Sequence, residues 1–423
     1  MKLIIKNAKL RNHETLMSIG IDNGKIVAID HHIDADAEKV IDAKGHLVLP
    51  PFIDPHLHLD AVLSVGDPRF NESGTLLEGI QIWGERKPFL TKEILKKNAI
   101  EAIKWEVANG ALKIRTHADT TDSTLLTVES LLEVKEEMKE LVDLQIVAFP
   151  QDGIFTTKEG LDLMKRSLEM GVDVVGGIPH NEFTREDGVK DVETVFELAE
   201  KFDALIDIHV DETGDEQSRF VEVMAKETIV RGWQGRVTAS HTTAMHNYNN
   251  DYAFKLIGIL KRAEMNMITN PFDNSVLQNR TDGYPRRRGH TRVDELLARE
   301  VNVSIGHDSI MDPWYPMGKG SMLQAANLLL HTAHMSGYSQ VSQLIDMITD
   351  NSAKTMNLAE GYGIKVGNQA DIIILDATSE FDAIRLMSEC LFVIRKGNIV
   401  SETQPATRLL NFGGEVRNID FKL

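Results

Sequence analysis

The sequence of 423 residues contains a single cysteine, Cys390. An intrachain disulfide is therefore excluded, as is a zinc site built from cysteine thiolates, and we expect a reducing compartment, the cytoplasm. No apolar run approaches the roughly 20 residues that cross a bilayer, and the segment from Met1 lacks the long apolar core of a signal peptide. We therefore predict a protein without a membrane span or a secretory leader.

Positive charge is also scarce, because 46 Lys and Arg stand against 64 Asp and Glu, which gives a formal net charge of -18. The negative electrostatic potential of such a chain repels polyphosphates and argues against a DNA or RNA partner, whereas a neutral small molecule is not repelled. Apolar residues make up 42% of the chain and charged residues 26%, which is ordinary for a globular protein. We therefore expect a small-molecule substrate.

Short runs rich in β-branched and apolar residues recur along the chain. They are 48–58, 113–117, 144–150, 173–179, 205–210, 236–241, 266–270 and 301–307. From the third onward they begin roughly thirty residues apart, with helical patterns between them, such as 191–202, where Asp191 is the expected N-cap. Strand–helix units of this period predict an α/β fold, a TIM barrel over residues 48–365, with a doubly wound open sheet as the alternative.

The two ends of the chain, residues 1–47 and 366–423, have the texture of short strands joined by turns. Asn23-Gly24 between two apolar runs is a strong hairpin signal, and the tail adds runs at 370–375 and 390–394. We predict that both ends join into one small β-sandwich domain beside the barrel. Within the barrel, residues 64–79 are expected to form a loop that covers the site.

The strongest functional signal is the motif His56-Leu57-His58 at the end of the first barrel run. Alternate residues of a strand point to the same side, so both imidazoles can face one metal ion. Barrel active sites lie at the carboxyl ends of the strands, where His209, His241 and Asp308 also end runs or follow them. His56, His58, His209 and Asp308 form a set suited to one catalytic divalent ion with an open position for water.

Three groups beside these ligands can move protons. Glu212 follows His209 on the loop that leaves the strand, where burial near a metal suits a proton carrier, although an acid at a helix N-terminus is the alternative. His241 either orients and deprotonates the water or is a fifth metal ligand. Asp308 can serve as both ligand and base.

No lysine ends the fourth run, residues 174–180. Binuclear relatives of this architecture bridge two metals through a modified lysine at that place, so we predict a mononuclear site and disfavour a hydantoinase-like or dihydroorotase-like reaction. His117 and His180 also end runs. We assign them no role and interpret them as rim residues with satisfied hydrogen bonds.

Longer motifs extend these residues into a resemblance to the amidohydrolase superfamily, specifically to the metal-dependent cytosine deaminases of bacterial type, over nearly the whole chain. The motifs are 73–80, 147–151, 178–180, 209–212, 238–246, 306–308 and 312–316. The resemblance implies Fe(II) or Zn(II) at the four ligands and a homo-oligomer. It implies that Gln151 holds the carbonyl and N–H edge of a pyrimidine, Glu212 contacts ring N3, His241 lies against the water and Trp314 walls the pocket. A capping amide is the alternative for Gln151, and ordinary packing for Trp314.

The implied reaction is the hydrolytic deamination of a free pyrimidine base. Water activated by the metal would attack C4 while Glu212 protonates N3, His241 and Asp308 would take up the water proton, and ammonia would leave. The rival hypotheses are hydrolysis of another aminated heterocycle (isoguanine, creatinine or an N-alkylamino triazine) and a barrel that binds a ligand without catalysis.

One residue departs from the cytosine deaminase pattern, which carries a second aspartate directly after the metal-binding one, where this chain has Ser309. Serine is shorter and uncharged, so we expect a pocket with more room and without a carboxylate beside the amine and C5 of the ring. One methyl group in a fitted pocket is worth about 1–3 kcal/mol. We predict that 5-methylcytosine is accepted and gives thymine and ammonia. Alternatively, Asp312 or a water replaces the lost group and cytosine remains the better substrate.

Overall fold

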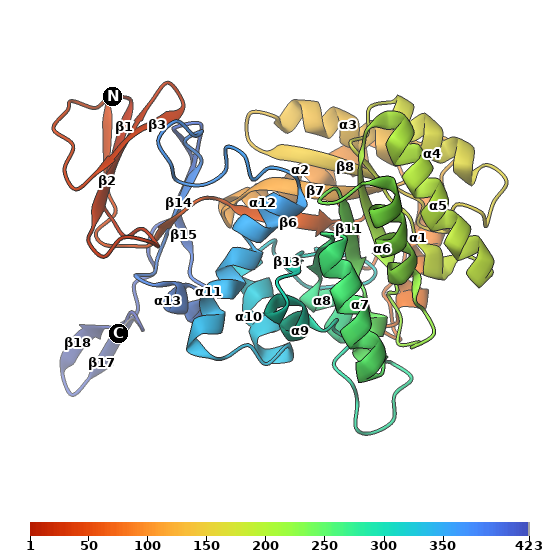
Figure 1. Ribbon diagram of the computed structural model, residues 1–423. Helices are drawn as coiled ribbons and strands as arrows, with labels where there is room; N and C mark the ends of the chain where they lie inside the picture. The colour runs from red at the N-terminus through yellow and green to blue at the C-terminus, as the bar shows by residue number, and fades with distance from the viewer. Residues whose placement is uncertain (422–423) are drawn as a thin grey trace.

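A barrel with a smaller pair of sheets at one side makes up the computed structural model, which describes residues 1–421 (Figure 1). Its 8-stranded parallel sheet has strand order β13-β12-β11-β10-β9-β8-β7-β6. The strands are β6 (Phe52–Leu57), β7 (Ala111–Asp119), β8 (Asp143–Phe149), β9 (Val174–Val175), β10 (Leu205–Val210), β11 (Val237–His241), β12 (Asn266–Thr269) and β13 (Asn302–Ile305). A parallel bridge between Leu57 and Asp308 joins the first strand to the end of the last. The predicted TIM barrel is confirmed, and the open sheet is not what forms.

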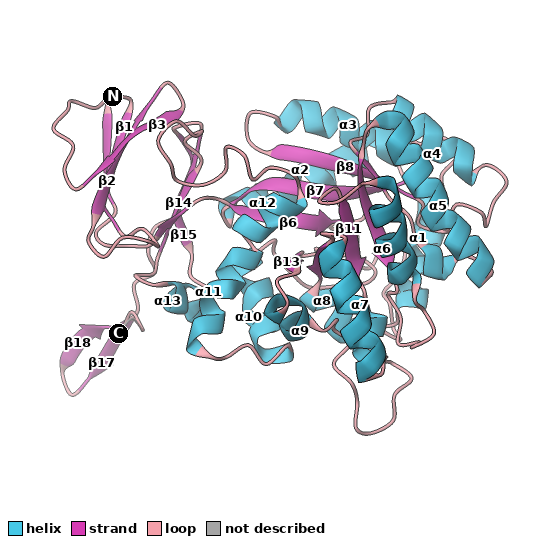
Figure 2. Cartoon of the chain, in the orientation of Figure 1, coloured by secondary structure: helices cyan, strands magenta, loops and turns pink. Residues whose placement is uncertain are grey.

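Helices surround this sheet (Figure 2). They are α1 (Leu76–Arg86), α2 (Lys92–Ala108), α3 (Leu126–Met138), α4 (Gly160–Glu169), α5 (Arg185–Phe202), α6 (Phe220–Arg231), α7 (Asn250–Arg262), α8 (Pro271–Leu277), α9 (Val293–Ala298), α10 (Met322–Thr332), α11 (Tyr338–Met347), α12 (Asp350–Thr355) and α13 (Glu380–Leu386), with short 3₁₀ turns η1 (Lys87–Phe89), η2 (Pro179–Asn181) and η3 (Thr243–Asn247). Each long barrel helix buries an apolar stripe against the strands, as an amphipathic helix must.

The expected N-cap of α5 is wrong. The helix begins at Arg185, where the Thr184 side chain accepts a hydrogen bond from Asp187 N, and Asp191 lies buried in the middle of the helix. Residues 185–187 are charged and carry no apolar period, so no sequence pattern indicated the turns that precede Asp191. The predicted covering loop likewise ends early, because Thr75 caps α1 and residues 76–79 are helical.

The first barrel run is two strands rather than one. Pro50 and Pro51 lack the N–H that a sheet ladder needs, and the run divides there. β5 (Val48–Leu49) pairs with β14 (Ile372–Leu375) of the small domain, whereas β6 enters the barrel. The predicted domain limits, residues 1–47 with 366–423 and residues 48–365, stay a prediction. β5 lies just past the limit between residues 47 and 48, on the barrel side, yet it pairs with a strand of the small domain.

The predicted small β domain contains two 4-stranded sheets, ordered β3-β2-β1-β4 and β16-β15-β14-β5. Their remaining strands are β1 (Leu3–Ala8), β2 (Met17–Asp22), β3 (Lys25–Asp30), β4 (Lys39–Asp42), β14 (Ile372–Leu375), β15 (Cys390–Arg395) and β16 (Asn398–Glu402). One apolar cluster joins both ends of the chain through residues such as Ile5, Ile19, Ile372 and Ile394, so the predicted sandwich is confirmed. Asn23-Gly24 forms the expected hairpin turn, with positive φ at both residues.

A hairpin of β17 (Leu409–Phe412) and β18 (Glu415–Asn418) extends away from both domains (Figure 1). Its side chains are exposed, including the apolar Leu409, Leu410, Phe412 and Val416. Among residues 1–421, no helix combines the length and apolarity that a transmembrane segment requires.

Candidate metal centre and substrate pocket

Three strand ends bring the predicted metal ligands together. His56 lies at the end of β6 with His58 just beyond it, His209 lies in β10, and Asp308 follows β13. Backbone hydrogen bonds from Asp308 N to His56 O (2.8 Å) and from His58 N to Asp308 O (3.0 Å) hold two of these segments side by side. We call His56, His58, His209 and Asp308 the histidine–aspartate cluster.

Distances within the histidine–aspartate cluster suit a shared ion. Nε2 of His58 lies 3.1 Å from Nε2 of His209, and Asp308 Oδ1 lies 3.4 Å from Nε2 of both His56 and His58. Nε2 of His56 is buried and has no hydrogen-bond partner among the described residues. Three imidazole nitrogens and one carboxylate are a donor set that one divalent ion prefers, and an unpartnered buried nitrogen is expected where an ion binds. The residues therefore fit the implied metal.

Burial keeps these imidazoles neutral. It lowers the pKa of His58 to about 4 and the pKa of His56 and His209 well below the ordinary value, so their nitrogen lone pairs are available near neutral pH. The pKa of Asp308 is raised by burial and by the neighbouring carboxyls of Asp273 and Glu212. A cation at the histidine–aspartate cluster would relieve that crowding of acids.

The interpretation of His117 as a rim residue is wrong. Its side chain, from β7, is fully buried, and its ring centroid lies 4.1 Å from that of His56 and 4.6 Å from that of His209. Ring nitrogens of His56, His58, His117 and His209 all lie within 4.8 Å of one another, so His117 is a further possible donor. The sequence had placed His117 at a strand end but offered no reason to turn it inward.

His241 ends β11 with a positive φ of 70°, and Asp308 has one of 72°. Residues other than glycine rarely adopt a positive φ, and such backbone strain is concentrated at functional sites. Asn274 Nδ2 donates to Nδ1 of His241 at 2.9 Å, and this ring nitrogen also lies 3.4 Å from Oε1 of Glu212. His241 also forms a second possible ligand group with His56 and Asp308, so it can reach both the ion and its water.

A chain of buried side chains supports His56 from behind. Ser240 Oγ lies 3.1 Å from Nδ1 of His56 and donates to Asp207 Oδ1 at 2.6 Å. Asp207 also accepts from Arg115 Nη1 at 2.9 Å, and this ion pair is fully buried. Partners of this kind fix the orientation and tautomer of a metal-binding imidazole.

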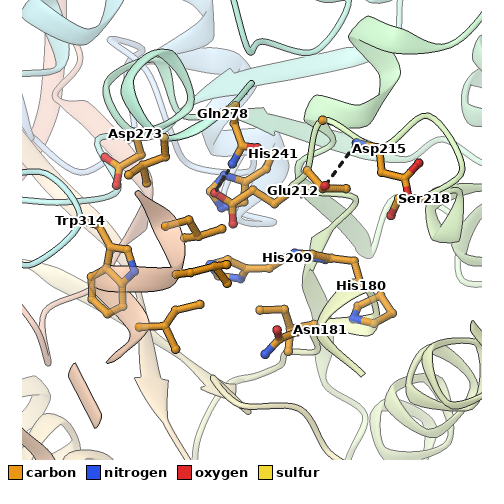
Figure 3. Close-up of a pocket in the computed structure, with 18 of the residues that line it drawn as sticks. His180, Asn181, His209, Glu212, Asp215, Ser218, His241, Asp273, Gln278 and Trp314 are labelled. Atoms are coloured by element: carbon orange, nitrogen blue, oxygen red, sulfur yellow. Dashed lines mark hydrogen bonds and ion pairs between the residues drawn. The ribbon is translucent and has the colours of Figure 1, made fainter. Parts of the chain in front are cut away.

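A cavity of about 680 Å³ opens above the histidine–aspartate cluster. Glu212 lies in its wall, where its Oε1 accepts from Gln278 Nε2 at 3.2 Å (Figure 3). Burial raises the pKa of Glu212 to about 8, so this carboxyl holds a proton at neutral pH. A protonated carboxyl at this place is a candidate general acid.

The remaining predicted substrate residues line the same cavity. Gln151 follows β8, Trp314 lies near His58 with ring centroids 6.4 Å apart, and Ser309 is buried next to Asp308. His180, in η2, also lines the cavity, on the side away from Trp314 (Figure 3).

The expected loss of a carboxyl beside Ser309 is wrong. Asp273 lines the cavity, and Ser309 Oγ donates to its Oδ2 at 2.8 Å. The Asp312 carboxyl also has a hydrogen bond to the Ser309 side chain, and its Oδ1 accepts from the backbone N–H groups of Trp314 and Tyr315, but Asp312 is not among the residues that line the cavity. The pocket therefore keeps an acid, supplied by α8 instead of the strand end.

Three site residues that sequence reasoning missed lie on or directly after α8: Asp273, Asn274 and Gln278. We call them the α8 wall. An acid in the first turn of a helix is also what helix capping favours, so Asp273 carried no distinct signal. Asn274 and Gln278 contact His241 and Glu212 only through the tertiary fold.

Comparisons with known proteins agree with this architecture. Residues 39–401 match the amidohydrolase family, and the chain belongs to that family. It is 45% identical to the 5-methylcytosine deaminase of Klebsiella pneumoniae liganded with phosphonocytosine, with a TM-score of 0.93 over 96% of this chain and 99% of that one. The chain is 44% identical to the same enzyme in its complex with 5-fluorocytosine, with a TM-score of 0.92 over 95% of this chain and 98% of that one.

A curated relative carries a different activity. The chain is 32% identical over 409 residues to the N-isopropylammelide isopropyl amidohydrolase of Pseudomonas sp. (strain ADP), which covers 94% of this chain and 96% of the relative. The resemblance inferred from the motifs is confirmed at the level of the family and of its cytosine deaminase-like members.

Proposed function

We propose that the protein hydrolytically deaminates a free pyrimidine base, either 5-methylcytosine to thymine or cytosine to uracil, with release of ammonia. The observation that carries this proposal is the buried proton-holding Glu212 beside a histidine–aspartate cluster, in a chain 45% identical to a 5-methylcytosine deaminase. A metal-dependent hydrolase of this kind needs an acid, a base and a nucleophile around one carbon.

The side chains supply the positioning and the proton transfers. A bound divalent ion, Fe(II) or Zn(II), contributes Lewis acidity that makes a water nucleophilic near neutral pH. Glu212 gives its proton to ring N3 as C4 is attacked, so negative charge does not build up on the ring. His241, held by Asn274, and Asp308 take up the proton of the water. The proton taken up by His241 and Asp308 then passes to the exocyclic amine, the C4–N bond breaks and ammonia leaves, while the C4 hydroxyl returns a proton to Glu212 and becomes the carbonyl. Gln151 holds the carbonyl edge of the ring and Trp314 covers it throughout.

Ser309 favours 5-methylcytosine over cytosine in this scheme. Its side chain is short and is turned toward Asp273, which leaves space beside C5 of the ring. Filling that space with a methyl group is worth about 1–3 kcal/mol in a fitted pocket.

Ammonia release from a panel of bases tests the proposal. Protein loaded separately with Fe(II) and Zn(II) is assayed on cytosine, 5-methylcytosine, isoguanine, creatinine and an N-alkylamino triazine, with metal content measured on the same samples. We expect kcat/KM for 5-methylcytosine to equal or exceed that for cytosine. Absence of ammonia from both pyrimidines would show the proposed substrate class to be wrong.

Hydrolysis of an N-alkylamino triazine is a second candidate. The relative from Pseudomonas supports it, and a cavity of about 680 Å³ is not restricted to one pyrimidine ring. In this case the triazine, rather than either pyrimidine, would give the highest kcat/KM in the panel.

We also propose that the chain forms a homo-oligomer. The exposed apolar side chains of the β17–β18 hairpin form the kind of surface that contacts a partner, and a second copy is the expected one. Light scattering of the intact protein tests this, and a monomer at micromolar concentration would contradict it.

A further inference from the structure

Asp273 is a buried acid in the substrate cavity with one oxygen in use and one oxygen free. The third residue of α8, it is 2% exposed. Oδ2 accepts from Ser309 Oγ at 2.8 Å, whereas Oδ1 has no hydrogen-bond partner among the described residues. A buried polar oxygen without a partner is costly unless a ligand satisfies it.

The position of Asp273 matches one edge of the proposed substrate. In Figure 3, Asp273 and Trp314 lie on one side of Glu212 and His209, whereas His180 lies on the other. When C4 faces the histidine–aspartate cluster and N3 faces Glu212, C5 lies on the opposite side of C4 from N3. The edge that carries the amine and C5 then faces Asp273.

We propose that Asp273 is a substrate-binding residue that contacts the exocyclic amine of the base, and that Ser309 is the positioning residue that holds its carboxyl back from C5. This inference rests on the proposed function and deepens it. Asp273 and Ser309 together, rather than Ser309 alone, determine which groups are accepted at C4 and C5.

Division of labour between the two side chains explains how one pocket recognises an amine and tolerates a methyl group. The hydrogen bond from Ser309 fixes Oδ2 and leaves Oδ1 for the amine. A site built to bind an N–H group discriminates strongly against an analogue without it, because its own polar atom is then left unpaired. Space beside C5 depends on the carboxyl staying in the position that Ser309 gives it.

Asp273→Asn tests the contact, and Asp294→Asn is the matched control, because Asp294 is an exposed acid in the first turn of α9. The metal-loaded full-length protein is assayed for kcat/KM on 5-methylcytosine and for inhibition by pyrimidin-2-one, a ring without the exocyclic amine. Asp273→Asn should lower kcat/KM by roughly 10- to 100-fold while the inhibition constant of pyrimidin-2-one stays within about twofold. The control should change neither quantity.

Ser309→Ala tests the positioning role. The preference for 5-methylcytosine over cytosine should fall severalfold, and the double variant with Asp273→Asn should be no worse than Asp273→Asn alone, because both changes remove one coupled unit.

Unchanged kcat/KM in Asp273→Asn would overturn the inference, and so would an equal loss of substrate turnover and pyrimidin-2-one affinity, which would indicate structural damage. If the unsubstituted protein releases no ammonia from any pyrimidine, the proposed function itself fails. Full activity with an unaffected Asp273→Asn variant would instead leave the function standing and remove only this contact.

Discussion

The histidine–aspartate cluster and the α8 wall face the same cavity but are held in different ways. Ligands of the cluster lie at or just past the ends of hydrogen-bonded parallel strands, so the sheet ladder fixes their backbone. Residues of the α8 wall belong to a seven-residue helix and its end, and they are held by side-chain hydrogen bonds to His241, Glu212 and Ser309. The cluster therefore determines whether the chemistry occurs, and the wall adjusts proton affinity and substrate choice.

Removing a cluster ligand should have the largest effect. His209→Asn is expected to abolish both metal binding and turnover, because three remaining donors hold a divalent ion poorly. Metal analysis and ammonia release measure this, and His331→Asn, at an exposed histidine of α10, is the control. Two equivalents of metal in the unsubstituted protein would contradict the predicted mononuclear site.

Glu212→Gln should cause the second-largest loss of activity. We expect kcat to fall by roughly 10²–10⁴-fold with metal content unchanged, because the amide cannot supply the proton that ring N3 requires. Glu216→Gln, at an exposed residue of the same loop, provides the comparison. Near-normal turnover of Glu212→Gln would show that another group carries the proton.

Ser240→Ala should weaken metal binding without removing it. Loss of the hydroxyl between His56 and Asp207 frees the imidazole to reorient, which typically costs about 10–100-fold in metal affinity. Competition with a chelator measures the affinity, and turnover at saturating metal should be nearly normal. Ser167→Ala removes an equally buried hydroxyl from α4 and should leave metal affinity unchanged.

The smallest expected effect lies in the pH profile. Because the pKa of Glu212 is raised to about 8, the proton donor is present below that pH and is lost as the pH rises through it, so kcat/KM should fall there. Gln278 stabilises the carboxylate form, so Gln278→Ala should raise the pKa of Glu212 and move this fall upward by roughly 0.5–1 pH unit. Gln81→Ala removes a similar bond to Glu85 on the surface, and the profile should not move.

Much of the barrel could be predicted from the sequence. Strand β10 coincides with its predicted run, because buried parallel strands are continuous apolar segments with clear ends. The division of the run at 48–58 could not be predicted, because its two halves belong to different sheets and only the strand pairing of the folded chain separates them. The start of α5 was missed because the residues that open it, 185–187, are charged and carry no apolar signal.

Within the site, the same contrast holds. His56 and His58 could be placed on one face from strand periodicity alone, since alternate residues share a side. His117 and Asp273 could not be placed. The inward turn of His117 depends on neighbouring strands, and Asp273 enters the cavity only because the tertiary fold places α8 in the cavity wall.

By itself the sequence determined the alternation of strands and helices, the histidines and acid at the strand ends, and the family to which those motifs point, because periodicity and local motifs are properties of short segments. Only the tertiary structure decided that α8 brings the carboxyl of Asp273 within hydrogen-bond distance of Ser309, and that Gln278 lies against Glu212. These contacts join residues that are 36 and 66 positions apart. No local pattern encodes such pairs, since they form only when barrel closure brings separate strand–helix units to one rim.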